Sequence, residues 1–308
     1  MWNKSRIDEI LSWYTSENPG VRTNLYRNFC HGKLAGTGRV LMLPADQGIE
    51  HGPGRSFSNN PAAYDPRYHI DLAIEAGCSA YVAPLGFIEA VASDYAGRIP
   101  LVLKLNGRDQ LHRDPNPMLA QFATVEDALR LGCTAVGFCI YPGTDKRRIL
   151  YEQLREVIRQ AKNVGLPVIV WSYPRGGNIP REAETAADIT TYAAHLAAQL
   201  GAHIIYLKLP TERVENDNTR IFYEKHGVSL ATLEDRIRHV LQGAFQGRRI
   251  VLFSGGPRGD VDILLNEAVA IRNAGAAGQM IGRNSFQRSH EAALELFEQL
   301  VRVYRGAD

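Results

Sequence analysis

Short apolar runs rich in β-branched residues recur along the whole chain, and amphipathic segments separate most of them. Runs of this length and composition are typical of strands that are buried on both faces of a parallel sheet. Eight such runs are predicted strands: 39–46, 79–84, 100–106, 134–141, 166–173, 202–209, 249–256 and 278–282. Four segments between or after them have apolar residues at helical spacing and are predicted helices: 150–165, 186–201, 261–275 and 289–304.

Glycine stands between a helical segment and the next strand at five places. Glycine ends helices readily because it adopts the left-handed conformation at low cost. The five residues are Gly77, Gly132, Gly165, Gly201 and Gly275. A repeated order of strand, helix, glycine and strand requires parallel crossover connections. Eight such units predict a (βα)8 TIM barrel, with an open doubly wound sheet as the alternative.

The first part of the chain lies outside this repeat. Its apolar residues at helical spacing are Ile7, Ile10, Leu11 and Tyr14. We therefore expect an N-terminal helical extension over 1–38 and a single barrel domain over 39–308. The sequence leaves open whether the extension docks on its own barrel or on a neighbouring subunit.

Composition excludes several classes of function. Lys plus Arg number 35 and Asp plus Glu 33, a formal net charge of +2, so neither nucleic acid nor an anionic membrane is an expected partner. The sequence shows no secretory signal and no apolar run of about 18 residues, so a cytoplasmic location is expected. The four cysteines have no CxxC spacing, which favours buried free thiols over zinc or disulfides.

Two lysines close predicted strands, at the end of the barrel where active sites form. Lys208 ends the run IIYLKLP and Lys104 ends PLVLKLN. Either side chain could simply reach solvent from a strand end. A lysine at the end of an apolar strand, however, is costly to keep charged, and the neutral amine attacks carbonyls to form a Schiff base. Two ammonium groups facing one cavity would also lower each other's pKa and attract phosphate, so Lys104 is a predicted phosphate contact.

Two glycine-containing loops follow the last two predicted strands. Ser254, Gly255 and Gly256 open the segment SGGPRGD, and Gly282 and Arg283 belong to IGRNSF. Either loop alone is more often an ordinary turn. Barrels, however, often bind phosphate between the loops after strands seven and eight, where free backbone N–H groups surround the anion. We therefore predict a phosphate site there, completed by the Arg283 guanidinium.

The segment VIVWSYPRGG supplies aromatic candidates. Tyr173 is a candidate acid or base at the reacting carbon, its phenol tuned by a nearby ammonium. Residues two apart on a strand point to the same side, so Trp171 lies on the same face as Tyr173 and would line the same cavity. Arg175 is a further candidate anion contact. Taken singly, the two aromatic residues would more often be core residues, and Arg175 could equally be a surface charge.

Asp46 closes the first predicted strand, in LPADQGIEHGPG, where it could serve as acid or base or pair with a catalytic lysine. Glu50 and His51 follow it. No HxH or HExxH spacing accompanies them, so a metal site is not expected.

Five motifs in this order, LPADQGIEHGP, VWSYPRGG, YLKLP, SGGPRGD and IGRNSFQR, resemble the DhnA-type class I fructose-bisphosphate aldolases of bacteria and archaea. The likeness covers roughly residues 35–290. It implies a (βα)8 fold and Schiff-base chemistry that needs neither metal nor cofactor. By this resemblance, Lys208 corresponds to the Schiff-base lysine of the family and Tyr173 to its acid/base tyrosine, and Asp46 and Trp171 correspond to its active-site aspartate and tryptophan. The resemblance also implies that the two glycine loops hold a phosphate.

The activity implied by the resemblance is reversible cleavage of fructose 1,6-bisphosphate to dihydroxyacetone phosphate and glyceraldehyde 3-phosphate, as in glycolysis and gluconeogenesis, by a homo-oligomer. The family also uses a carboxylate downstream of the lysine, for which Glu212 and Glu215 are both candidates. The proline directly after LKL departs from the usual pattern of the family. Alternatives are a transaldolase-like synthase of aromatic amino-acid biosynthesis, a thiolase-like enzyme, or a non-catalytic sugar-phosphate-binding regulator. A regulator would not need Lys208, Tyr173 and Asp46 together.

Overall fold

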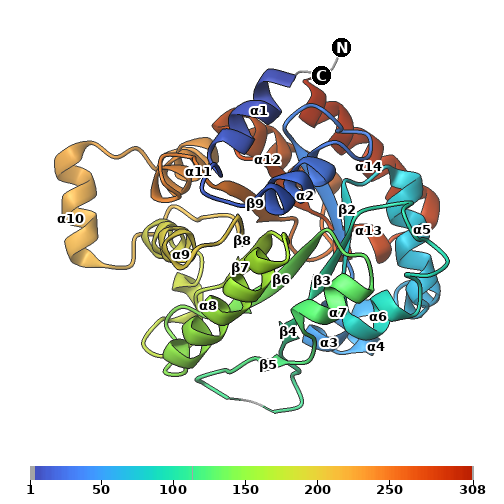
Figure 1. The fold of residues 1–308 in the computed structure, drawn as a ribbon. Coiled ribbons are helices and arrows are strands. Elements are labelled where there is room, and N and C mark those ends of the chain that lie inside the picture. Colours follow the sequence, from blue (N-terminus) through green and yellow to red (C-terminus); the bar gives the residue numbers. More distant parts are fainter. Residues whose placement is uncertain (1–3, 113, 307–308) are drawn as a thin grey trace.

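All eight predicted strands form one closed parallel barrel (Figure 1). The computed structural model describes residues 4–112 and 114–306. Around the barrel the order is β1, β2, β3, β6, β7, β8, β9 and β10, and β10 pairs with β1 again. Closure confirms the (βα)8 barrel and excludes the open doubly wound sheet. The strands are β1 (Val40–Pro44), β2 (Ala80–Pro84), β3 (Leu101–Lys104), β6 (Ala135–Ile140), β7 (Val168–Ser172), β8 (Ile204–Leu207), β9 (Ile250–Ser254) and β10 (Gly278–Met280).

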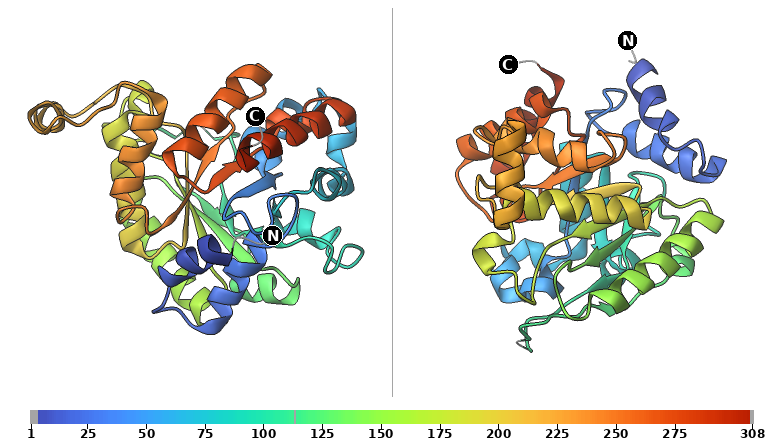
Figure 2. Two further views of the ribbon diagram at one scale, coloured as in Figure 1. Left: turned by 90° about the horizontal axis from the view of Figure 1, so that it is seen from above. Right: turned by 90° about the vertical axis from the view of Figure 1, so that its left-hand side faces the viewer.

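Helices surround the barrel on the outside (Figure 2). The four predicted helices are confirmed as α8 (Arg147–Asn163), α9 (Ala187–Leu200), α12 (Val261–Ala274) and α14 (His290–Arg305). The other outer helices are α5 (Pro66–Ala76), α6 (Leu85–Glu89), α7 (Val125–Arg130) and α11 (Leu233–Gly243). Short elements in the loops are α3 (Gln47–His51), α4 (Pro53–Phe57), η1 (Pro61–Tyr64), η2 (Arg181–Ala183), α10 (Asp217–His226) and α13 (Arg283–Phe286).

The five glycines predicted to end helices all have positive φ, between 68° at Gly132 and 102° at Gly201. Three of them, Gly77, Gly201 and Gly275, are left-handed C-caps. A residue with a side chain would be strained at these positions, so each glycine stops its helix and turns the chain toward the next strand.

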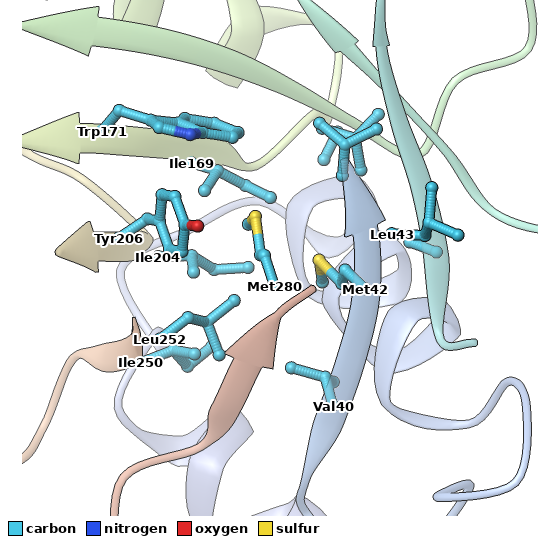
Figure 3. Close-up of a cluster of buried hydrophobic side chains, with 14 of the residues drawn as sticks. Val40, Met42, Leu43, Ile169, Trp171, Ile204, Tyr206, Ile250, Leu252 and Met280 are labelled. Atoms are coloured by element: carbon cyan, nitrogen blue, oxygen red, sulfur yellow. The ribbon is translucent and has the colours of Figure 1, made fainter. Parts of the chain in front are cut away.

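Strand alternation fills the barrel interior with apolar side chains. Figure 3 shows the part of this core contributed by β1 and β7 to β10, with Val40 and Ile250 toward one end and Trp171 and Tyr206 toward the other. Ile169 and Trp171 point inward from β7, and Ile204 and Tyr206 from β8, because residues two apart share a face. The next inward positions on these strands, Tyr173 and Lys208, therefore reach the carboxyl end of the barrel.

The described part of the N-terminal segment consists of α1 (Lys4–Ser12) and α2 (Pro19–Phe29). It docks on its own barrel, at the amino ends of the strands. The Tyr14 hydroxyl donates to the His203 carbonyl (2.5 Å) and accepts from the Ile250 amide (3.1 Å). This resolves the question that the sequence left open about docking, whereas the division into an extension and one barrel domain stays a prediction.

Two excursions leave the barrel at its carboxyl end. The third predicted strand ends early, at Lys104, and the chain then forms a two-stranded antiparallel sheet from β4 (Asn106–Gly107) and β5 (Ala120–Gln121). After β8 the chain projects outward to α10, which stands away from the body in Figures 1 and 2. Across the described residues, no helix has the length and apolar character required to cross a membrane.

Candidate active site

A cavity of about 890 Å³ opens at the carboxyl ends of the strands. Every predicted site residue except Lys104 lines it. These residues are Asp46, Trp171, Tyr173, Arg175, Lys208, Ser254, Gly255, Gly256, Gly282 and Arg283. They come from β1, β7, β8, β9 and β10 and the loops that follow them, so the barrel brings together motifs that are far apart in the sequence. Whether each of them touches a substrate stays a prediction.

Lys208 presents its amine to the cavity. Its side chain is 37% exposed, its Nζ lies 3.0 Å from Glu184 Oε2, and the amine is 5.8 Å from the centre of the Tyr173 ring. Arg175 contacts the other oxygen of the same carboxylate, at 3.5 Å. The amine is thus accessible to a small molecule and has a carboxylate beside it that can exchange protons with it.

The carboxylate beside Lys208 precedes it in the sequence instead of following it. Neither Glu212 nor Glu215 lines the cavity: Glu212 is exposed, and Glu215 forms an ion pair with Arg213 at 2.6 Å. The expectation of a downstream carboxylate at one of these two positions is therefore wrong for this structure. Glu184 comes from the irregular loop after β7, just past η2, and no periodicity in that segment signalled it.

The segment that holds Glu184 is attached to the segment that follows Lys208. Ala186 and Thr211 form an isolated parallel bridge, and the carboxylate of the buried Asp188 accepts from the amides of Glu215 (3.0 Å) and Asn216 (2.9 Å). Both segments are irregular, so these bonds keep Glu184 opposite Lys208.

Lys104 lies below the cavity, inside the barrel, where its side chain is 1% exposed. Its Nζ is 2.6 Å from Asp46 Oδ2 and 3.2 Å from Glu50 Oε1, and it lies 4.4 Å from the centre of the Trp171 ring. Burial lowers the pKa of this lysine, but the two carboxylates outweigh burial and raise it. Lys104 therefore does not reach a phosphate in the cavity, contrary to the prediction, and Asp46 pairs with Lys104 and not with Lys208.

A glycine on the neighbouring strand makes room for this arrangement. A Cβ at Gly137 on β6 would lie 2.7 Å from the Trp171 ring and 3.3 Å from Lys104 Cδ. Any side chain at this position would collide with the indole. Gly137 therefore lets Trp171 lie flat against the barrel wall and over the ammonium.

Tyr173 is a protonated phenol near neutral pH. Burial raises its pKa well above 10, and the neighbouring Tyr206 and Glu50 raise it further. Burial and these neighbours, and not an ammonium, are thus the main influences on the pKa of this phenol. Tyr206 packs against Trp171 on β7 and against Tyr173 just after it, with ring centres 5.3 Å and 5.9 Å apart. Sequence reasoning missed Tyr206 although it precedes Lys208 by two residues.

The two glycine loops are joined by Asn284. Its Nδ2 donates to the carbonyls of Gly255 (2.5 Å) and Pro257 (2.8 Å), and its Oδ1 accepts from the Gly259 amide at 3.0 Å. The amides of Gly255 and Gly256 already have partners, the Met280 carbonyl at 3.2 Å and Ser254 Oγ at 3.1 Å. The expectation that both amides are free is therefore wrong for this structure.

Cations surround the cavity. Arg55, Arg108, Arg175, Arg181 and Arg283 all line it. Burial and the nearby Arg55 lower the pKa of Arg283, and burial together with Arg283 lowers that of His51 to about 4. Among the described residues that line the cavity, these arginines and Lys208 make six cations against five carboxyl side chains, and this small excess of positive charge favours an anionic ligand. Within the described residues, no three His, Cys, Asp or Glu side chains come together in a way that could hold a metal ion.

Comparison with known proteins agrees with this site. The profile of the DeoC/LacD family aldolases matches residues 40–288. The chain is 36% identical over 256 residues to the class 1 fructose-bisphosphate aldolase of Thermoproteus tenax (83% of this chain, 86% of that protein). It is 34% identical to the probable class 1 enzyme of Chlamydia muridarum (94% and 86%).

Solved structures show the same likeness. An archaeal fructose-1,6-bisphosphate aldolase, with its catalytic lysine covalently bound to the carbinolamine intermediate, superimposes with a TM-score of 0.74 at 34% identity, covering 87% of this chain and 94% of the other. The aldolase of Slackia heliotrinireducens, 23% identical, shares the fold with a TM-score of 0.78 (96% and 93%). The chain therefore belongs to the DeoC/LacD family of aldolases, and its resemblance to the DhnA-type class I enzymes is confirmed.

Proposed function

We propose that this chain is a class I fructose-bisphosphate aldolase that forms its Schiff base on Lys208. The observation that carries the proposal is the position of the Lys208 amine: it reaches the cavity, with a carboxylate at 3.0 Å and a protonated phenol beside it. The cations around the cavity suit a substrate with two phosphates. The relatives named as class 1 fructose-bisphosphate aldolases support the same activity.

The chemistry begins with proton loss from the lysine. Glu184 accepts a proton from Lys208, and the free amine adds to the C2 carbonyl of the ketose. Loss of water gives an iminium, which withdraws electrons while the C3–C4 bond breaks. Tyr173 relays the proton of the C4 hydroxyl, directly or through water, and later protonates C3. Asp46 orients the carbinolamine from the cavity floor, held there by Lys104.

Two groups of cations determine which way round the substrate binds. Arg283 and the loops after β9 and β10 line one side of the cavity. They hold the phosphate nearest the C2 carbonyl. Arg175 lies beside Glu184, with its guanidinium 4.9 Å from the centre of the Tyr141 ring, and we assign the second phosphate to its side, where Arg181 also lines the cavity. Binding energy at both phosphates aligns C2 with the amine.

Borohydride reduction in the presence of fructose 1,6-bisphosphate and EDTA tests the proposal. We expect a triose-phosphate-sized adduct on the peptide that contains Lys208, located by mass spectrometry, and no adduct in Lys208→Met. An adduct formed only with another carbonyl substrate would indicate a sister activity of the family. Absence of an adduct with any sugar phosphate would refute the Schiff-base mechanism.

We also propose that the enzyme assembles from several copies of the chain. None of the ten residues of α10 is buried, and Ile221 and Phe222 on it are 59% and 61% exposed. So short a helix is marginal in water without packing partners, which supports its burial in an assembly. Light scattering on the wild type and on Phe222→Ser is expected to show a multimer that the substitution weakens.

A further inference from the structure

Asp46 and Glu50 line the same cavity as Lys208, and the buried Lys104 pairs with both, but the mechanism above gives Glu50 no role. We propose that Glu50 is a catalytic acid in this reaction, donating its proton to the C2 hydroxyl of the carbinolamine as that hydroxyl leaves as water. Lys104 acts as a positioning residue that holds both carboxyl groups at the cavity floor. The inference rests on the proposed aldolase function and assigns one of its proton transfers.

The geometry separates the two carboxyl groups. Asp46 has a 5% exposed side chain and lies 2.6 Å from the ammonium, whereas Glu50 is 18% exposed and lies 3.2 Å from it. Both line the cavity, but Lys104 does not. Asp46 is therefore the more tightly paired carboxyl group, and Glu50 is the looser and more accessible one.

Charge balance places a proton on Glu50. One ammonium and two carboxylates would leave a net negative charge in a space that excludes most water, which is costly. One bound proton makes the cluster neutral, and it resides on the carboxyl group farther from the ammonium. Burial and the nearby Asp46 raise the pKa of Glu50, against the opposing effect of Lys104 and Arg175. Two neighbouring carboxyl groups with different protonation suit acid catalysis.

The step balances without any further reactant. The C2–O bond of the carbinolamine breaks, and its electron pair goes to the oxygen, which takes the Glu50 proton and departs as water. The nitrogen lone pair of Lys208 forms the C=N bond of the iminium. Glu50 becomes a carboxylate, which the Lys104 ammonium stabilises at 3.2 Å until a proton returns. Hydrolysis of the final iminium is the reverse, with Glu50 as base.

Stability alone does not explain this cluster. A buried ion pair is on average no more stabilising than apolar residues of the same volume. Several groups near Glu50 also line the cavity. They are Asp46, Tyr141, Tyr173, Arg175 and Arg283.

Glu50→Gln provides the test, because it keeps the shape and the acceptor for Lys104 but removes the acid. The measurement is rapid mixing with dihydroxyacetone phosphate followed by borohydride, which reduces the iminium but not the carbinolamine. We expect the iminium to form about 10² to 10⁴ times more slowly in the variant. The wild-type rate should fall as pH rises through the pKa of Glu50, and this dependence should disappear in Glu50→Gln.

Glu156→Gln on α8 is a matched control, since it makes the same change at an exposed glutamate that pairs with Arg159 and does not line the cavity. It should form the iminium at the wild-type rate. Glu50→Asp keeps an ionisable acid, so it should be slower than the wild type yet retain the pH dependence, which a purely structural role does not predict. If Glu50→Gln forms the iminium as fast as the wild type, the inference is wrong while the aldolase function stands. If the wild type forms none, the aldolase function itself fails.

Discussion

Lys104 and Lys208 occupy the same kind of position in the chain and have opposite surroundings in the molecule. Each ends a barrel strand within the sequence Leu-Lys-Leu. Lys104 is 1% exposed and is held by two carboxylates under an indole ring, whereas Lys208 is 37% exposed and meets one carboxylate at the cavity wall.

The difference shows how a barrel gives one residue type two uses. An ammonium fixed between two carboxylates cannot give up its proton easily, so it serves as a permanent charge. An amine at the edge of the cavity, with one carboxylate beside it, can exchange its proton and reach a carbonyl. Nucleophile and fixed cation are thus distinguished by their neighbours.

The largest effect should come from replacing each lysine by methionine in turn. Lys208→Met should lose aldol cleavage by on the order of 10⁴-fold or more, since the covalent intermediate cannot form. Lys104→Met should still give a borohydride adduct on Lys208, although more slowly. Cleavage assays and peptide mass analysis check this, and an adduct on Lys104 in the wild type would reverse the assignment.

Tyr173→Phe separates Schiff-base formation on Lys208 from the proton transfer that follows it. The phenol is the proposed proton relay, so cleavage should slow by about 10² to 10⁴-fold. Formation of the Schiff base itself should persist, because Lys208 and Glu184 are intact. The measurement compares the rate of cleavage with the rate of Schiff-base formation. If both rates fall equally, Tyr173 assists Lys208 and does not relay the C4 proton.

The two lysine substitutions should rank in opposite order for their effects on stability and on activity. Lys104→Met leaves two buried carboxyl groups without their cation and should cost about 3–5 kcal/mol in the free energy of unfolding. Lys208→Met removes an ion pair whose lysine side chain is 37% exposed and should cost less than about 1 kcal/mol. Urea denaturation of both variants gives the values. Equal costs would mean that burial does not distinguish the two lysines.

The smallest effect concerns the cations of the cavity. Arg283→Met should raise KM for fructose 1,6-bisphosphate by about 10 to 100-fold, roughly the contribution of one charge-assisted pair. The turnover number should change less, since the lysine chemistry is untouched. Steady-state kinetics at two salt concentrations check this, because the wild-type KM should depend on salt more strongly than that of the variant.

Much of this architecture was predictable, since strand periodicity and helix-ending glycines are local properties. The same periodicity placed Lys208 and Tyr173 at the carboxyl end of the barrel. The distinction between the two lysines was not predictable, because Leu-Lys-Leu is identical at both and the deciding groups come from other strands. Gly137 makes the space, Trp171 covers it, and neither is adjacent to Lys104 in the sequence.

Glu184 escaped prediction for a related reason. It lies in an irregular loop whose path depends on the Ala186–Thr211 bridge and on bonds from Asp188 to residues almost thirty positions later. Likewise, the partners of the Gly255 and Gly256 amides depend on how the loop folds, which glycine content alone does not determine.

The space left by Gly137 also gives the protein a natural optical reporter. Trp171 lies inside the barrel wall, over a fixed ammonium, and lines the cavity. Its emission should respond to whatever enters the cavity and to the charge beneath it. Ligand arrival and proton movement at the reaction centre can therefore be followed by fluorescence in real time, without a label and without turnover.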